Sequence, residues 1–177
     1  AAILAGIAPE RGASFTAIEP APARAKLVSN SLRNLAGQWE VITTDARTYE
    51  PAHLFDRILV DAPCTGLGAL RRRPEARWRK QPSDVPALAT LQSELLNHAA
   101  ELVRIGGVIG YATCSPHLAE TDAIVATFLK THPNFVARPI APTLPQLNLS
   151  SDSLSLRLRP DVHGTDGMYL ALLQRLA

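Results

Sequence analysis

The sequence predicts an α/β protein with a doubly wound, mostly parallel sheet that ends in an antiparallel hairpin. Short apolar segments rich in β-branched and aromatic residues alternate with segments whose apolar residues recur every three or four positions. Strands that alternate with helices imply parallel pairing through crossover helices. The last two apolar segments are separated only by DVHGTDG, which leaves no room for a helix, so we expect them to pair antiparallel.

The first third of the chain supplies strands and one complete helix. The opening AAILAGIAPERG has the pattern of the end of a helix. Strands are expected at residues 14–19, 39–44 and 55–60, and a helix is expected at residues 21–36.

A long amphipathic helix, residues 85–103, opens the second part, because its apolar side chains form one stripe. Ser83 or Asp84 can cap its start, and Gly106 with Gly107 is expected to stop it. After it we expect a strand at residues 108–113, a helix with acidic residues in its first turn at 118–132, and a strand at 135–140. A surface loop at residues 141–155 is expected to follow, and then the two strands of the hairpin at 155–160 and 167–174.

Composition limits the kind of protein. With 177 residues, 46% of them hydrophobic, we expect residues 1–177 to form one domain with a substantial core. No apolar segment approaches the roughly 20 residues needed to cross a bilayer, and no basic leader is present, so we expect neither a membrane partner nor a signal peptide. Two cysteines favour a cytoplasmic protein with free thiols, and the alternative role for them is that of small buried apolar residues.

Polar residues with useful chemistry follow the expected strands: Glu19, Asp45, Asp61 with Cys64, and Cys114. Ligands of an open parallel sheet bind beyond the carboxyl ends of its strands. Glu19 is suited to accept both hydroxyls of a ribose, although a solvated glutamate would have the same pattern. Together with Asp45 it suggests a cofactor that contains a nucleoside.

The loop DAPCTGLG, residues 61–68, is the most specific of these strand ends. Pro63 fixes the backbone, while Gly66 and Gly68 permit tight or left-handed turns, so the loop is suited to hold something close to its main chain. Asp61 directly follows an apolar strand, where an ionised carboxylate is costly without a partner, and this favours a functional role.

Three segments, in this order and with the long helix between the first two, carry a family resemblance: FDRILVDAPCTGLGALRRRPEARW, GGVIGYATCSPHLAETDAIVATFL and HGTDGMYLALL. They resemble the Sun (Fmu) family of S-adenosylmethionine-dependent RNA cytosine-C5 methyltransferases over most of the chain, except residues 141–155. The resemblance implies a Rossmann-like class I methyltransferase sheet, S-adenosylmethionine as cofactor and a cytosine of 16S ribosomal RNA as substrate. A cytosine in tRNA or DNA is an alternative substrate.

The resemblance also implies roles for individual residues. C5 of cytosine is a poor nucleophile, so a thiolate must first add to C6. In this family the TC cysteine attacks, which corresponds to Cys114, and the PC cysteine, Cys64, assists release of the product. Asp61 would orient or protonate the base near the methionine end of the cofactor. Glu19 and Arg24 match positions near the ribose, and Asp45 matches the position near the adenine.

The stretch RRRPEARWRK, residues 71–80, holds six cations and one anion, although the net charge of the chain is only +2. In a protein that acts on RNA these cations would contact phosphate, and Trp78 would stack on a base or pack. A solvated basic connection is the alternative. The expected RNA-binding residues are Arg71, Arg72, Arg73, Arg77 and Lys80.

The five histidines have no ligand spacing, so we expect no metal site, and a turn role for His163 in HGTDG. Family members carry a strand and a Gly-rich cofactor loop ahead of the helix that opens this chain. We therefore expect the chain to be a fragment without the first strand of the sheet, which by itself binds S-adenosylmethionine weakly or not at all. A catalytically idle RNA-binding remnant is the alternative to an enzyme.

Overall fold

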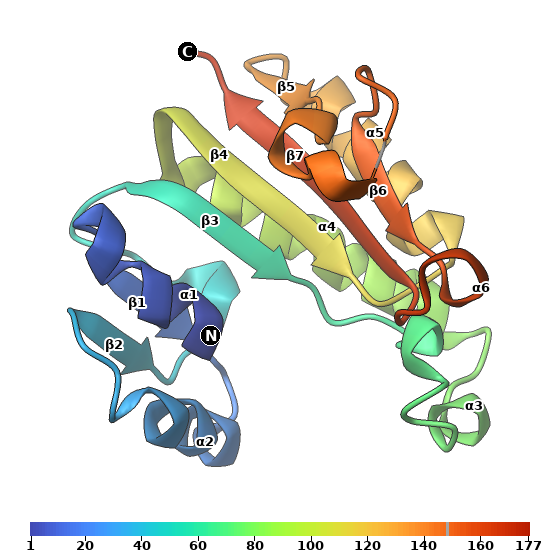
Figure 1. Ribbon diagram of the computed structural model, residues 1–177, viewed down its shortest axis with the longest axis horizontal. Helices are drawn as coiled ribbons and strands as arrows, with labels where there is room; N and C mark the ends of the chain where they lie inside the picture. The colour runs from blue at the N-terminus through green and yellow to red at the C-terminus, as the bar shows by residue number, and fades with distance from the viewer. Residues whose placement is uncertain (148) are drawn as a thin grey trace. The chain divides into compact units, whose positions relative to one another are not determined.

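The computed structural model describes residues 1–147 and 149–177. The chain divides into two compact units, an N-terminal unit of Ala1–Glu50 and a C-terminal unit of Pro51–Ala177 (Figure 1). The single domain expected from the chain length stays a prediction. Among the described residues, no helix has both the length and the apolar character needed to span a membrane.

The N-terminal unit contains two helices, α1 (Ala2–Ile7) and α2 (Pro22–Leu32), and two strands, β1 (Phe15–Ile18) and β2 (Trp39–Ile42). The strands pair in parallel, and α2 is the crossover between them and packs on β2. Pro22 opens α2, at a position where its missing N–H costs nothing. These elements confirm the order predicted for this part of the sequence.

The C-terminal unit is built on a five-stranded sheet of β3 (Phe55–Asp61), β4 (Val103–Thr113), β5 (Phe135–Arg138), β6 (Ser155–Leu158) and β7 (Met168–Arg175). The order is β3-β4-β7-β5, and β6 also pairs with β7. β3 and β4 are parallel, and β7 runs antiparallel to β4, β5 and β6. A mixed sheet with an antiparallel C-terminal part confirms the predicted fold class. The pairing of β7 with β4 and β5 was not part of the expectation.

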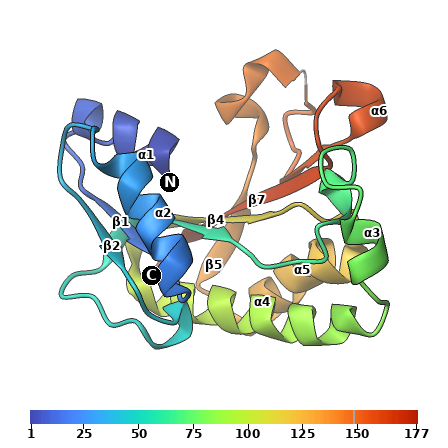
Figure 2. The ribbon, with the colours of Figure 1, turned by 90° about the horizontal axis from the view of Figure 1, so that it is seen from below.

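Two helices, α4 (Asp84–Leu102) and α5 (Asp122–Thr131), cover one face of this sheet (Figure 2). Leu96 of α4 and Phe128 of α5 are buried against the strands. Tyr111 and Tyr169, on the neighbouring strands β4 and β7, are also buried and meet edge to face with ring centroids 6.3 Å apart. This core fixes the carboxyl ends of β3 and β4, where the two cysteines follow.

Several element boundaries differ from the expectation. Gly106 and Gly107 do not stop the long helix, which ends at Leu102. They lie instead in an irregular part of β4, where the register jumps from the pair Phe55–Val103 to the pair Arg57–Val108 and Gly106 takes a φ of 75°. Because this bulge absorbs the extra residues, β4 begins directly after the helix.

Short helices also occur where none was expected. α6 (Pro160–His163) lies between β6 and β7, because a single helical turn starting at a proline fits in the space judged too short for a helix. α3 (Ala76–Arg79) lies within the basic stretch. The helix expected at residues 118–132 is divided by Thr121 into a 3₁₀ turn, η4 (Leu118–Glu120), and α5. Residues 141–155 contain two further 3₁₀ turns, and Asn148 in this expected loop lies outside the described residues.

Candidate active site

The two cysteines meet at the carboxyl end of the sheet in the C-terminal unit. The Cys64 loop (residues 62–66) follows β3 and the Cys114 loop (residues 114–117) follows β4. These strands are parallel neighbours with Asp61 opposite Ala112, so both loops leave the sheet on the same edge. The two Sγ atoms are 3.4 Å apart, within the range of a hydrogen bond between sulfur atoms. Both thiols are free and partly exposed.

A close crossing of three backbone segments holds this arrangement. The Gly68 N–H donates to the Cys114 carbonyl over 2.8 Å, and the Gly167 N–H donates to the Gly68 carbonyl, also over 2.8 Å. A Cβ atom on Gly68 would lie 2.1 Å from the Gly167 oxygen and 2.8 Å from the Cys114 oxygen. Only glycine fits at position 68, and a Cβ atom on Gly167 would lie 3.1 Å from the Gly68 Cα, so this position is tight as well.

The two thiols differ in acidity. The hydrogen bond from Cys64 lowers the pKa of Cys114 to about 7, with a smaller favourable effect of the Arg73 charge. The same hydrogen bond and burial raise the pKa of Cys64 well above its ordinary value. The contact therefore favours the thiolate form at Cys114 over the thiolate form at Cys64.

A buried glutamate lies beneath the two loops. Glu120, at the end of η4, has no exposed surface. Its carboxylate accepts hydrogen bonds from Thr65, from Ser115 and from Gln92 of α4. Burial alone would raise the pKa of Glu120, but these hydrogen bonds outweigh it, and the pKa lies below its ordinary value.

Sequence reasoning missed this group of polar residues. Glu120 belongs to the acidic residues that were expected in the first turn of the helix at residues 118–132, where the helix dipole favours negative charge. The structure instead buries it, while Asp122 takes the place in the first turn of α5. The available signal was the hydroxyl residue that directly follows each cysteine, Thr65 and Ser115, since two such neighbours need a common partner once they are buried.

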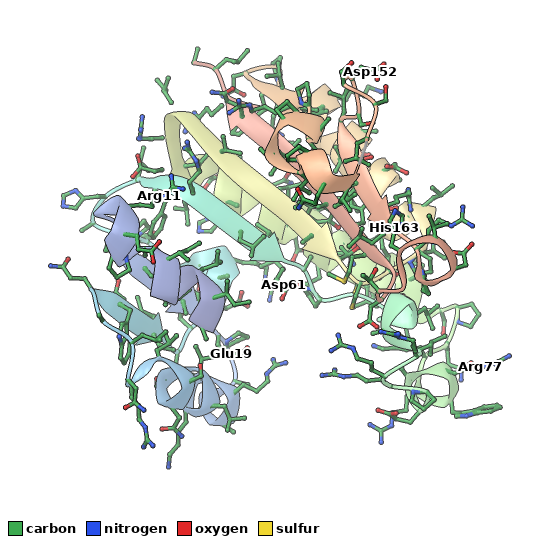
Figure 3. The ribbon with its side chains drawn as sticks, in the orientation of Figure 1. Arg11, Glu19, Asp61, Arg77, Asp152 and His163 are labelled. Carbon is green, nitrogen blue, oxygen red and sulfur yellow. The ribbon has the colours of Figure 1, made fainter. Side chains whose placement is uncertain are left out.

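Asp61 lies at the end of β3 with its side chain exposed (Figure 3). The cost of burying its charge, which favoured a functional role from the sequence, is therefore absent, and that argument is wrong. β3 is only half buried, with Leu59 52% exposed, because β4 is its one partner among the described strands. Asp61 is still close enough to Cys114 for its charge to raise the pKa of that thiol, against the effect of Cys64.

The basic stretch is anchored near the cysteines at one end. The Arg72 Nε–H donates to the carboxylate of Asp166 over 2.7 Å, and Arg71 lies 3.9 Å from the same carboxylate. Asp166 is only 7% exposed and directly precedes Gly167 of the backbone crossing. Arg73 is exposed and lowers the pKa of Cys114.

The far end of the basic stretch lies in solvent. Trp78 on α3 is 80% exposed, and the Arg77 guanidinium lies 5.8 Å from the centre of its ring. Figure 3 shows Arg77 on α3, away from the sheet of this unit. Lys80 follows the helix and is partly exposed. The expected RNA-binding cations are thus accessible, with Arg72 already paired to Asp166.

The expected cofactor residues Glu19, Arg24 and Asp45 lie in the N-terminal unit. Glu19 follows β1, where its carboxylate accepts from the Ala21 N–H and pairs with Arg24, both over 2.9 Å. Asp45 follows β2 and pairs with Arg47, whose hydrogen bonds lower the pKa of the aspartate to about 2. Within this unit the Glu19 N–H bonds to the last residue of β2, so the two strands end side by side.

The described residues contain no group of three or more His, Cys, Asp and Glu side chains arranged to hold a metal ion. His163 lies at the end of α6, where its Nδ1 accepts from the Arg159 N–H. This places His163 in the turn between β6 and β7.

Comparison with known proteins identifies the family. The sequence model of the family described as "16S rRNA methyltransferase RsmB/F" matches residues 2–174. A putative methyltransferase of Mycobacterium tuberculosis is 52% identical over 99% of the chain, and a probable ribosomal RNA small subunit methyltransferase B of Synechocystis is 38% identical over 77%. The chain spans 38% and 31% of the lengths of these two relatives.

Two solved structures superpose on most of this chain. The protein called PH0851 superposes with a TM-score of 0.82 at 29% identity, over 92% of this chain and 37% of its own. The NSun6 protein from Pyrococcus horikoshii has a TM-score of 0.75 at 23% identity, over 93% of this chain and 42% of its own, which shows a shared fold. With a matching family model over nearly its whole length, the chain belongs to the RsmB/F family of 16S rRNA methyltransferases.

Proposed function

We propose that the chain is the catalytic part of an S-adenosylmethionine-dependent enzyme that methylates C5 of a cytosine in 16S ribosomal RNA through a covalent bond to Cys114. The observation that carries the proposal is the pair of thiols 3.4 Å apart at the ends of two parallel strands, with the pKa of Cys114 lowered to about 7. Relatives named as ribosomal RNA small subunit methyltransferases support the substrate class. Such an enzyme would act in the cytoplasm.

The chemistry begins at Cys114. Its thiolate adds to C6 of cytosine, an S–C6 bond forms, and the electron pair of the C5–C6 double bond moves to C5, which becomes nucleophilic. When bound, S-adenosylmethionine supplies an electrophilic methyl group that C5 takes up. Asp61 is suited to orient or protonate the base, since it ends the strand that leads to the Cys64 loop.

Release of the product requires loss of the C5 proton to a base and departure of Cys114. As the proton leaves, its electron pair restores the C5–C6 double bond and the S–C6 bond breaks, which returns a thiolate to Cys114. Cys64 stays protonated at neutral pH because its pKa is raised, so it can donate a hydrogen bond to this thiolate as it forms. The pair therefore divides the work into attack by Cys114 and support of departure by Cys64.

The residues of the N-terminal unit fit a nucleoside cofactor unequally. The Glu19 carboxylate is held in place by Arg24 and the Ala21 N–H at the end of β1, which suits an acceptor for ribose hydroxyls. Both oxygens of Asp45 accept from Arg47, so a contact with adenine requires this exposed pair to open or to share the carboxylate.

Trapping with a suicide substrate tests the proposed function. In the full-length protein with S-adenosylmethionine, an RNA substrate that carries 5-fluorocytosine should form a stable adduct, because fluorine at C5 cannot leave as a proton. Mass spectrometry of the digested adduct is expected to locate the bond on Cys114. A bond on Cys64 would exchange the two roles, and the absence of any adduct would refute the covalent mechanism.

The basic stretch predicts a salt-dependent contribution to RNA binding. Arg71→Ala and Arg77→Ala should each weaken binding and reduce the slope of log affinity against log salt by about 0.7, the value for one contact to a single-stranded phosphate. Filter binding at several salt concentrations measures this slope. Arg104→Ala is the control. Arg104 lies near the start of β4 and pairs with Asp56 of β3, whereas Cys114 follows the other end of β4. Equal slopes in all variants would count against RNA contact by these arginines.

A further inference from the structure

Glu120 connects the two cysteine loops through a single buried carboxylate. Its Oε1 accepts from the Thr65 N–H over 2.8 Å, and its Oε2 accepts from the Thr65 hydroxyl over 2.6 Å and from the Ser115 hydroxyl over 2.5 Å. Thr65 directly follows Cys64, and Ser115 directly follows Cys114. Each cysteine is thus one residue away from a group that the same carboxylate holds.

Buried residues of α4 and β4 also hold Glu120 in place. The Gln92 amide of α4 donates to Glu120 over 3.1 Å and to the carbonyl of Pro63, which precedes Cys64, over 2.8 Å. The Tyr111 hydroxyl donates to the Glu120 carbonyl over 2.9 Å. Gln92 and Tyr111 are fully buried, so the position of Glu120 is set by the core between α4 and β4.

Joining two loops through a fully buried carboxylate has an unfavourable desolvation free energy. Removing an ionised group from water carries a large desolvation cost, and well-packed apolar residues of similar volume often stabilise a fold at least as well. A carboxylate offers something that an apolar side chain cannot, which is several acceptor sites with fixed directions. Here those directions set the spacing of two loops that each carry a cysteine.

We propose that Glu120 is a positioning residue that holds Cys64 within hydrogen-bond distance of Cys114 and so keeps the attacking thiol activated. The importance of Glu120 for catalysis rests on the proposed function, but the effect of Glu120 on the two thiols can be measured whether or not the proposed function is correct. If the carboxylate is lost, the two loops keep only the Gly68–Cys114 backbone bond and the 3.2 Å contact between the Thr65 and Ser115 hydroxyls. We expect the 3.4 Å contact to lengthen, so that Cys114 loses its main source of stabilisation as a thiolate.

The test is the pH dependence of alkylation of Cys114 in the full-length protein. Iodoacetamide labelling is followed by mass spectrometry of the peptide that contains Cys114, in the wild type and in Glu120→Ala, Glu120→Gln and Ser115→Ala. We expect the midpoint to rise by about one pH unit or more in Glu120→Ala and Ser115→Ala, towards the value of a free thiol. The midpoint of Glu120→Gln should rise less. Its amide oxygen can still accept from the Thr65 N–H, and its NH2 group can donate hydrogen bonds to the oxygens of the two hydroxyls.

Ser93→Ala is the matched control. It removes one hydroxyl from α4 that bonds only to a helical carbonyl in the described contacts, so its midpoint should equal that of the wild type. Circular dichroism checks folding, and if Glu120→Ala does not fold, Ser115→Ala and Glu120→Gln decide together. Ser115→Ala removes the Ser115 bonds to Glu120 and to Thr65, whereas Glu120→Gln changes the carboxylate alone. Wild-type midpoints in the folded variants would overturn the proposal.

The adduct with 5-fluorocytosine RNA separates this proposal from the proposed function. At pH 7, Ser115→Ala should form the adduct about tenfold more slowly, because its thiolate fraction falls to a few per cent, and at pH 9 the rate should recover. Shifted alkylation midpoints without any adduct in the wild type would refute the proposed function alone. A wild-type adduct together with unshifted midpoints would refute the positioning role alone.

Discussion

Replacing Cys114 by alanine in the full-length enzyme is expected to lower turnover on the order of 10⁴-fold or more, since loss of a covalent nucleophile leaves only binding and positioning effects. The Cys114 thiol has the lowered pKa, whereas the hydrogen bond to Cys114 and burial raise the pKa of Cys64, the other thiol in the described cysteine loops. Methyl transfer from radiolabelled S-adenosylmethionine to the RNA measures the loss. Retention of more than a tenth of wild-type turnover would contradict the role of Cys114.

Cys64→Ala gives the contrasting result. Bond formation by Cys114 should continue at a reduced rate, because Cys64 no longer stabilises its thiolate, but departure of the sulfur should slow further. The protein is therefore expected to accumulate as a covalent complex with ordinary cytosine RNA. Denaturing gel electrophoresis detects this complex as a band of reduced mobility. The double variant Cys64→Ala with Cys114→Ala is the control, and it should show no such band. A Cys64→Ala enzyme that turns over normally without accumulating complex would remove Cys64 from the release step.

Gly68→Ala is expected to destabilise the protein by more than about 3 kcal/mol, because its added methyl group would overlap two carbonyl oxygens that belong to backbone. The Cβ would lie 2.1 Å from the Gly167 oxygen and 2.8 Å from the Cys114 oxygen, and neither can move without disturbing the site. Urea unfolding followed by circular dichroism measures the change in the free energy of unfolding. We also expect loss of methyl transfer, because the Gly68 N–H holds the Cys114 carbonyl.

Gly164→Ala is the matched control for this substitution. Gly164 has a φ of 63°, and no other atom lies within 4 Å of its added Cβ, so alanine there carries only the cost of a left-handed backbone, about 1–2 kcal/mol. The difference between the two variants isolates the effect of the close crossing. Equal losses in stability would mean that the crossing can relax and that the glycine is not required by contact.

The elements predicted from sequence were those with a strong local signal. The amphipathic stripe of the long helix and the apolar strands on either side of it are local patterns, and the structure confirms them. The start of β4 was wrong because Gly106 and Gly107 are common both after helices and in bulges, and the pairing with β3 decides between the two. The position of β7 between β4 and β5 also depends on long-range pairing, which has no local pattern.

In the candidate site, too, the residues with a local sequence signal were predicted and those that depend on long-range contacts were not. The sequence placed Cys64 and Cys114 each beyond the carboxyl end of a strand, where ligands of a parallel sheet bind, and the structure places the two sulfur atoms 3.4 Å apart. Glu120 could not be found, because an acidic residue near a helix start is normally solvated. Its burial depends on Gln92, 28 residues away, and on Thr65, 55 residues away. The burial argument for Asp61 was wrong because it took the end of an apolar strand to be buried, whereas Asp61 is exposed.

The place of β7 in the sheet has a consequence for synthesis on the ribosome. β7 pairs with β4 along one edge and with β5 and β6 along the other, so these three strands have no direct pairing with one another in the described sheet. Until residues 168–175 have left the exit tunnel, β4 therefore presents an unpaired edge, and such edges invite association with other chains. A nascent chain stalled before residue 168 should consequently be a preferred client of ribosome-associated chaperones, while one that carries an added C-terminal linker long enough to bring residue 175 out of the tunnel should not.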